Sequence, residues 1–432
     1  MSEWKEYRLG ELATVIPGYA FKGKDFGENG CRVVKIGDIA PPIVDVVNCL
    51  RIPTNKINGL DKFKLHKGDF VLAMTGATLG KVGRYRSEET GYINQRVAKF
   101  ENITGISDKQ FLYYLITSNY VSSEIINRGL GSAQPNISGK DIESINVFAP
   151  DLPTQTSIAE ILSSLDDKIE LNNKINKELE SLAQTLFKRW FIDFEFPNEN
   201  GEPYKSSGGE MVDSELGEIP KGWNLVKVQD LEHKLQTGTR PKGGVGGITQ
   251  GVPSIGAESV KKLGYYDFSK VKFVSEEFAA KMKRGKVEGY ELLIYKDGGK
   301  PGTFIPHFSM FGEGFPFDYF FINEHVFLLD FFNKEFNCFC YFYFDSEYVR
   351  PVFENNGGKA AIPGINQEDV RQLWVFNPEL ERVKLFGQFA HSSVSTILKN
   401  CKENIQLTNL RDTLLPKLIS GELEVSQFLT NS

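Results

Sequence analysis

The sequence predicts an α+β protein in which two tandem-repeated globular α/β domains are separated by two long helices, which form an antiparallel coiled coil with pseudo-twofold symmetry. Three observations predict this fold. Part of each half repeats at a constant offset of 228 residues, short apolar strands alternate with turns in both globular parts, and each repeat ends in a heptad pattern. The length of 432 residues leaves room for two or three domains.

The repeat is clearest where it has no gaps. Pairs matched at this offset are Pro135 and Pro363, Ile137 and Ile365, Asp141 and Asp369, Asn172 and Asn400, Asn176 and Asn404, and Leu186 and Leu414. Upstream the offset drifts, as expected where surface loops differ in length, and Ile93–Val97 matches Ile322–Val326. We therefore predict a first domain at 1–150, a central helix at 151–195, a linker at 196–221, a second domain at 222–378 and a C-terminal helix at 379–432.

Strands and one helix are predicted inside each globular part. The strand segments are Cys31–Ile36, Asp69–Met74, Tyr92–Phe100, Glu291–Tyr295 and Asp318–Leu329. A helix is predicted from an N-cap at Ser107 to a stop at Gly129. Its counterpart from Asn333 is so aromatic that pattern alone does not separate helix from strand, and the repeat favours helix.

A heptad seam is predicted after Pro153 and again in the C-terminal helix. Its members are Ile158, Leu162, Leu165, Ile169, Asn172, Leu179 and Leu186, and then Phe386, Ile397, Asn400, Leu407 and Leu414. Asparagine on a seam costs stability but fixes register and orientation, and two matched helices in one chain favour an intramolecular antiparallel pair. An ordinary amphipathic core helix is the alternative.

Composition excludes several classes of protein. With 41% hydrophobic and 25% charged residues and a mean hydropathy of -0.28, the chain is globular rather than disordered or collagen-like. No run approaches the roughly 18 apolar residues of a membrane-spanning helix, so we expect a cytoplasmic protein without membrane contact. The five cysteines lack Cys-x-x-Cys spacing, which indicates reduced thiols and no metal site.

Motifs that suggest catalysis fail on inspection. Gly76–Lys81 resembles a phosphate loop, but its glycines are too close together and Val82 stands where Ser or Thr binds magnesium. Asp166 and Lys168 fit a loose nuclease spacing, yet the heptad predicts that they are solvated charges inside a helix. The histidines form no HExxH motif or triad. We therefore predict no catalytic residue and no cofactor on this chain.

Charge is distributed unevenly along the chain, whose net charge is -6. Residues 1–150 carry 19 Lys and Arg against 16 Asp and Glu, whereas residues 151–221 carry 7 against 15. The acidity is thus concentrated in the middle, and the first domain is free to present a basic face.

The most specific sequence motif of the chain lies between the two domains. Residues 187–197 read FKRWFIDFEFP, and residues 214–223 read SELGEIPKGW. Together with the tandem repeat, they resemble the DNA-specificity subunit of a Type I restriction-modification system over essentially the whole chain. The resemblance implies two target recognition domains, each of which reads one half of a bipartite asymmetric site in double-stranded DNA. We expect the helices to space these domains and to dock modification subunits.

The resemblance also implies a non-catalytic subunit. Modification (methyltransferase) subunits would use S-adenosylmethionine, and restriction (translocase and nuclease) subunits would use ATP and Mg²⁺. A coiled-coil scaffold whose globular domains bind protein or carbohydrate is the alternative, and the net acidity is its support. An orphan methyltransferase is disfavoured, because the methyl-donor loop and the Asn-Pro-Pro-aromatic motif are missing.

Candidate DNA contacts are the basic and polar side chains of the loops. Arginine binds guanine bidentately, asparagine and glutamine bind adenine, and lysine more often holds phosphate. The candidates are Lys22, Lys24, Thr75, Thr78, Lys81, Arg84, Arg86, Gln95, Arg96, Gln134, Asn136, Ser138 and Lys140 in the first domain, and Arg240, Lys242, Lys296, Lys300, His325 and Asn366 in the second. A solvated surface side chain is the alternative for each, and for Asn94 and Gln95 it is a structural hydrogen bond.

Removing one heptad from each helix, Asn172–Glu178 together with Asn400–Gln406, preserves the predicted seam. It shortens each helix by roughly 10 Å, which equals about three base pairs. We expect the methylated motif of any surviving activity to keep both half-sites and to lose spacer bases, as sequencing of methylated DNA measures. An unchanged spacer would show that something other than these helices positions the two domains.

Overall fold

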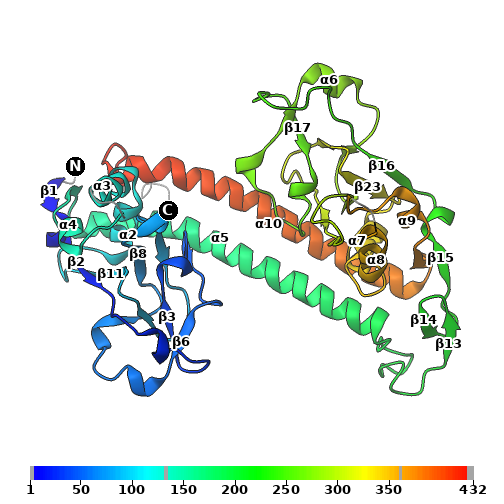
Figure 1. The fold of residues 1–432 in the computed structure, drawn as a ribbon, viewed down its shortest axis with the longest axis horizontal. Helices are drawn as coiled ribbons and strands as arrows, with labels where there is room; N and C mark the ends of the chain where they lie inside the picture. Colours follow the sequence, from blue (N-terminus) through cyan, green and yellow to red (C-terminus); the bar gives the residue numbers. More distant parts are fainter. Residues whose placement is uncertain (1–3, 131–134, 360–361, 426–432) are drawn as a thin grey trace. The chain divides into compact units, whose positions relative to one another are not determined.

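The structure, a computed structural model, describes residues 4–130, 135–359 and 362–425. The chain divides into two compact units, Met1–Asp167 with Leu407–Ser432 and Lys168–Gln406. Each of the two long helices, α5 (Leu152–Phe187) and α10 (Glu381–Ile419), contributes one segment to each unit (Figure 1). Within the described ranges, no helix has both the length and the apolar character needed to cross a membrane.

The first unit is built on two sheets (Figure 1). The larger sheet has the order β2 (Ala13–Pro17), β11 (Val97–Asn102), β8 (Phe70–Ala73), β9 (Val82–Arg84), β5 (Ile43–Val44), β4 (Ile39–Ala40). The smaller has the order β6 (Leu50–Ile52), β3 (Cys31–Val34), β10 (Gly91–Ile93), β7 (Lys64–Leu65). The antiparallel pair of β1 (Lys5–Arg8) and β12 (Asn146–Ala149) joins the beginning of the domain to its end.

The second unit repeats this topology. One sheet has the order β16 (Lys234–Thr237), β23 (Val326–Asp330), β20 (Leu292–Tyr295), β21 (Phe308–Met310), and the other has the order β18 (Phe273–Val274), β17 (Val252–Ile255), β22 (Phe320–Ile322), β19 (Lys286–Val287). Its closing pair is β15 (Leu225–Lys227) with β24 (Trp374–Phe376). In the smaller sheets, β10 is parallel to β3 and β22 is parallel to β17, and the other pairs are antiparallel. The predicted tandem repeat is confirmed.

The helix predicted from Ser107 to Gly129 is instead two helices, α2 (Lys109–Thr117) and α3 (Asn119–Gly129). Asp108 rather than Ser107 is the N-cap of α2, because its carboxylate accepts hydrogen bonds from two backbone N–H groups of the first turn. Ser118 interrupts the run with an extended backbone, and its hydroxyl caps α3. The counterpart is a helix as predicted, α7 (Lys334–Phe344), and α8 (Arg350–Gly357) follows it.

Two predicted strands are each divided by a turn. Tyr92–Phe100 contains β10 and β11 with a turn at Asn94–Arg96 between them, and Asp318–Leu329 contains β22 and β23 with a turn at Asn323–His325. The first side chain of each turn accepts a hydrogen bond from the backbone just after it: Gln95 N donates to Asn94 Oδ1 at 2.6 Å, and His325 N donates to Asn323 Oδ1 at 2.9 Å. Such asparagine turns end a strand without a glycine.

In the second unit, α5 and α10 run antiparallel and are joined by a ladder of asparagines. The Asn172 amide is fully buried, and its Nδ2 donates to Asn404 Oδ1 at 2.9 Å and to Glu403 Oε2 at 2.7 Å. One turn further along α5, Asn400 Nδ2 donates to Asn176 Oδ1 at 2.8 Å. Partner numbers fall along α10 as they rise along α5, as the antiparallel prediction requires.

The apolar members of the predicted seam differ in burial. Four are fully buried: Ile158 and Leu162 in the core of the first unit, and Phe386 and Ile397 in that of the second. The half-buried ones are Leu165, Ile169, Leu179, Leu186, Leu407 and Leu414. Each helix therefore buries part of its apolar seam in the domain cores, and the rest of its surface is exposed to solvent.

In the first unit the same two helices meet around a buried carboxylate. Asp166 Oδ1 accepts a hydrogen bond from Arg411 Nη1 at 2.7 Å, and its Oδ2 accepts one from the Tyr114 hydroxyl at 2.6 Å and lies 3.2 Å from Arg84 Nη1. The Arg84 guanidinium also lies over the Tyr113 ring at 3.8 Å. Asp166 was predicted to be a solvated charge, and this is wrong: its side chain is only 10% exposed, because two arginines and a tyrosine cover it.

The second unit has no charge at the corresponding places. Strand pairing matches Arg84 with Met310, the helix caps match Tyr114 with Phe339, and the helix offset matches Asp166 with Val394 and Arg411 with Ala183. All four counterparts are buried in the core of the second unit. One frame thus holds an ionic cluster in one copy and an apolar cluster in the other.

The central helix was predicted to reach residue 195, but α5 ends at Phe187, and the chain from there through the predicted linker is folded into the second unit. Phe191, Phe194 and Phe196 are buried, and the Trp223 ring lies 5.0 Å from that of Phe196 and 5.4 Å from that of Phe376. The hairpin of β13 (Met211–Ser214) and β14 (Gly217–Pro220) follows. The segment is therefore a structural part of the second unit rather than an open connection.

Asp166→Ala should lower the free energy of unfolding by about 3–5 kcal/mol, because it leaves the buried Arg84 guanidinium without a carboxylate and leaves Arg411 with Asp412 alone. Urea denaturation measures this. The neighbouring Asp167→Ala is the matched control: that side chain is 60% exposed and pairs with Arg86 at 3.3 Å, so its loss should cost no more than about 1 kcal/mol.

Replacing the cluster with its counterparts from the second unit, Arg84→Met, Tyr114→Phe, Asp166→Val and Arg411→Ala together, should restore stability to the wild-type level or above it. Equal losses for Asp166→Ala and Asp167→Ala, or no recovery in the fourfold variant, would contradict this account of the cluster.

Candidate nucleic-acid interface

In the first unit, three loops meet beyond the end of β8. The backbone hydrogen bonds that join them are Met74 N to Arg96 O at 2.9 Å, Gly76 N to Pro135 O at 3.0 Å and Ile137 N to Met74 O at 3.0 Å. We call Thr75, Asn94–Arg96 and Pro135–Asn136 the first junction. Because the backbone holds it together, its outward side chains are not needed for the fold.

The first junction presents neutral and basic side chains. Gln95, Arg96 and Asn136 are exposed, and Lys81 is exposed at the end of the glycine loop that follows Thr75. Arg96 Nη1 donates to Thr75 Oγ1 at 3.4 Å, which leaves its other donors open to solvent. A guanidinium, two amides and an ammonium group on adjoining loops match the donors and acceptors of guanine, adenine and phosphate.

The second unit contains the same arrangement. Its loops are joined by Lys296 N to His325 O at 3.1 Å, Gly298 N to Pro363 O at 2.9 Å and Ile365 N to Lys296 O at 2.9 Å. The bridge between Asp297 and Gly364 corresponds to the one between Thr75 and Asn136. We call Asp297, Asn323–His325 and Pro363–Gly364 the second junction.

Charged side chains fill the second junction. Asp297 accepts a short hydrogen bond from His325 Nδ1, and its other oxygen lies 3.1 Å from Lys296 Nζ. Glu324 Oε1 lies 3.4 Å from His325 Nε2 and 3.5 Å from Arg240 Nη1. Two carboxylates and two permanent cations balance here, whereas the first junction carries a net positive charge.

Sequence reasoning missed Asp297 and Glu324, which lie at the centre of the second junction. Basic and amide side chains were selected because phosphate attracts them, and this criterion passes over acids. The signal was present in the repeat, which matches Glu324 with Gln95.

The remaining predicted contacts lie outside the two junctions. Exposed side chains on turns and loops are Lys22, Lys24, Lys242 and Lys300. The N-caps of α4 (Gly139–Glu143) and α9 (Gln367–Arg371) are Ser138 and Asn366, and Lys140 is exposed in the first turn of α4. Thr78 is half-buried and donates to Thr75 O at 3.2 Å, and Arg86 is half-buried beside Asp167. Gln134 lies outside the described residues.

Arg84 and Thr75 are corrected, because neither is on the surface. Arg84 is 3% exposed within the Asp166 cluster, and Thr75 is 1% exposed and donates from its hydroxyl to Pro135 O at 3.0 Å. Each has a structural role: Arg84 in the core beneath the sheet, and Thr75 in holding the loops of the first junction together.

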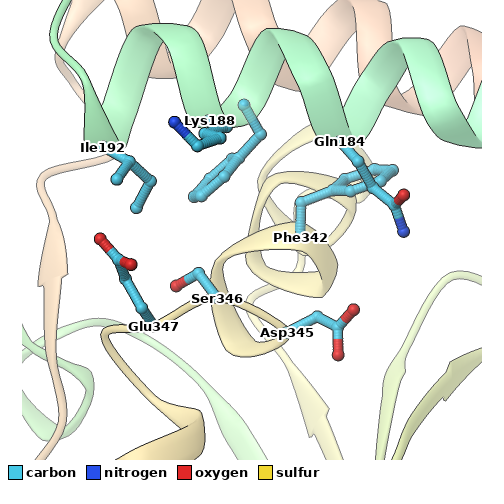
Figure 2. A pocket seen from close by; sticks show the side chains of 8 residues that line it. Gln184, Lys188, Ile192, Phe342, Asp345, Ser346 and Glu347 are labelled. Carbon is cyan, nitrogen blue, oxygen red and sulfur yellow. The ribbon is translucent and has the colours of Figure 1, made fainter.

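A pocket of about 280 Å³ lies in the second unit, away from the second junction. Figure 2 shows Gln184 of α5 and Lys188, just beyond the end of α5, on one side and Asp345, Ser346 and Glu347 on the other. Lys188 Nζ is already 2.7 Å from Asp193 Oδ1, and Asp345 pairs with Arg350. Phe187, Ile192 and Phe342 also line it, and Phe187 belongs to the packing of α5 against α7.

Among the described residues, there is no group of three or more His, Cys, Asp or Glu side chains that could hold a metal ion. Burial raises the pKa of the Cys49 thiol to about 12 and that of Cys401 to about 11. These thiols are therefore protonated near neutral pH and are poor nucleophiles and metal ligands. That the chain carries no cofactor stays a prediction.

Comparison with known proteins finds relatives over most of the chain. Residues 1–181 match the model of the Type I restriction modification DNA specificity domain. The chain is 27% identical over 334 residues to the Type I restriction enzyme MjaIX specificity subunit of Methanocaldococcus jannaschii, which covers 74% of this chain and 70% of that one. Over most of its length, this chain is therefore similar to Type I restriction-modification DNA specificity subunits.

Other relatives of the specificity-subunit family match over shorter lengths. The HindI specificity subunit of Haemophilus influenzae is 30% identical over 199 residues, which are 45% of this chain and 42% of that one. The crystal structure of a Type I system S subunit from M. genitalium has the same fold, with a TM-score of 0.58 over 96% of both chains at 15% identity. None of these comparisons supports the alternative of a protein- or carbohydrate-binding scaffold.

Proposed function

We propose that this specificity subunit reads a bipartite asymmetric site in double-stranded DNA, with the first junction contacting one half-site and the second junction the other. The observation that carries the proposal is the pair of matched junctions: one backbone frame holds Gln95 and Arg96 in one copy and Glu324 and His325 in the other. Two similar frames with different side chains suit a site whose two halves differ in sequence.

The helices complete the proposal. They connect the two domains along the chain, so we infer that their length sets the number of bases between the half-sites. We also infer that modification subunits dock on α5. Leu171, Ile175 and Leu182 recur on one helix face at spacings of four and seven residues, and they are 50%, 36% and 53% exposed. Exposed aliphatic side chains that recur along one helix face mark a surface that a partner helix covers.

The proposed partners supply the chemistry. Modification subunits would transfer methyl groups from S-adenosylmethionine, and restriction subunits would use ATP and Mg²⁺ for translocation and cleavage. This chain would contribute base recognition and placement. We place the complex in the cytoplasm, where the five cysteines stay reduced.

The variant Lys81→Ala with Arg96→Ala tests the first junction within the complex with modification subunits. We expect the methylated motif to lose base preference in one half-site and to keep the other. DNA affinity should fall, and its dependence on salt should become shallower by about 0.9 in log-log slope for each phosphate that the variant no longer neutralises. Methylome sequencing and titrations at several salt concentrations measure these effects.

Lys62→Ala is the matched control, because Lys62 is an exposed lysine on another turn of the same domain. It should leave motif and slope unchanged. If the double variant behaves like this control, or if both half-sites degrade together, the first junction is not an independent reader.

The triple variant Leu171→Gln, Ile175→Gln and Leu182→Gln tests the docking face. Glutamine keeps the helix propensity but removes apolar area, so association with modification subunits should weaken by at least about tenfold. Co-purification and binding titration measure this, with circular dichroism to check the fold. Val47→Gln, at an 82% exposed apolar side chain of the first domain, should have no effect. Unchanged association of the triple variant would remove α5 from the docking surface.

A further inference from the structure

The two junctions differ most at one matched position. Gln95 and Glu324 each follow the asparagine that ends a strand, and each precedes a residue whose carbonyl accepts a hydrogen bond from the end of the neighbouring strand. The backbone therefore presents the two side chains from the same place in each domain. Only the chemistry of the side chain has changed, from an amide that both donates and accepts to a carboxylate that only accepts.

The surroundings hold Glu324 in place without satisfying it. Arg240 and His325 lie beside Oε1, and the Glu324 backbone carbonyl accepts a hydrogen bond from Lys296 Nζ at 3.0 Å. Oε2 is buried, and no donor among the described residues reaches it. Because a buried acceptor without a donor is costly, a ligand that brings a donor to this carboxylate gains free energy there. The side chain as a whole is 34% exposed, so a ligand reaches the carboxylate at its open side, and a turn of the carboxylate brings Oε2 to the donor.

The chemistry of DNA limits what that donor can be. Phosphate oxygens are acceptors and repel a carboxylate, so Glu324 does not serve to hold the backbone. In the major groove the hydrogen-bond donors are the amino groups of cytosine and adenine. Adenine also presents the N7 acceptor beside its amino group. This acceptor repels a carboxylate, whereas a glutamine amide can donate to N7 and accept from the amino group.

We propose that Glu324 reads the amino group of a cytosine in the second half-site, and that Gln95 takes the matching place against an adenine in the first. The inference rests on the proposed function, within which it names a specificity-determining residue and its base. Arg240 acts as a positioning residue: it partly neutralises the carboxylate, so that it approaches the negatively charged duplex at lower electrostatic cost.

Glu324→Gln tests the proposal in the full complex with modification subunits, by selection of bound duplexes from a randomised pool and by methylome sequencing. We expect one position of the second half-site to change from cytosine to adenine, with a loss of at least about tenfold in preference for cytosine. The first half-site should not change. Glu277→Gln, at an exposed acid of α6 (Glu276–Lys281), is the matched control and should leave both half-sites as they are.

The reciprocal variant Gln95→Glu gives an independent measurement, with an expected change from adenine to cytosine at one position of the first half-site. An unchanged second half-site in Glu324→Gln overturns the inference, and so does a change in the wrong half-site or loss of all binding by a variant with the wild-type unfolding midpoint. A wild-type complex that shows no base preference in either half-site would instead overturn the proposed function, so the two failures are distinguishable.

Discussion

Asn172 is a fully buried amide between two long helices, and the register of α5 against α10 depends on it. A buried Nδ2 group on an apolar seam needs acceptors, and Asn404 and Glu403 supply them in this register. A slip of one turn would separate Asn172 from Asn404 and break at least one rung of the ladder that Asn176 and Asn400 continue. The same helices in the same antiparallel sense bring Arg411 to Asp166 in the first unit, so the ionic cluster there requires the register to be kept.

Backbone bonding explains how two copies of one frame have diverged so far. The loops of each junction are held by main-chain hydrogen bonds, which are the same in both copies although the side chains differ in charge. The cores show the same freedom, since Met310 and Val394 fill places that Arg84 and Asp166 occupy in the other copy. A buried ion pair and an apolar pair of similar volume are close in free energy when each is complete, and an incomplete exchange is costly.

The tandem organisation could be predicted from the sequence because the repeat and the heptads are local patterns. The turns at Asn94 and Asn323 could not, since an apolar run with one polar interruption is also typical of a continuous strand. The burial of Arg84 was missed because its carboxylate partner, Asp166, lies on a helix far along the chain, at a position that the heptad predicts to be exposed. Of the candidate site, the loops were predicted and the acids Asp297 and Glu324 were not. Candidates were chosen for attraction to phosphate, and a carboxylate can pair only with a base.

The aromatic cluster around Trp223 constrains how new specificities arise by recombination between related genes. A crossover at residue 222 would place a foreign indole against the resident rings of Phe191 and Phe196, whose centroids lie 5.6 and 5.0 Å from that of Trp223. A crossover within the helices meets the repeated sequence around Asn172 and Asn400 instead, and it divides none of these ring pairs. A domain therefore keeps its packing when it is exchanged together with its aromatic belt, which a crossover within the helical repeats allows.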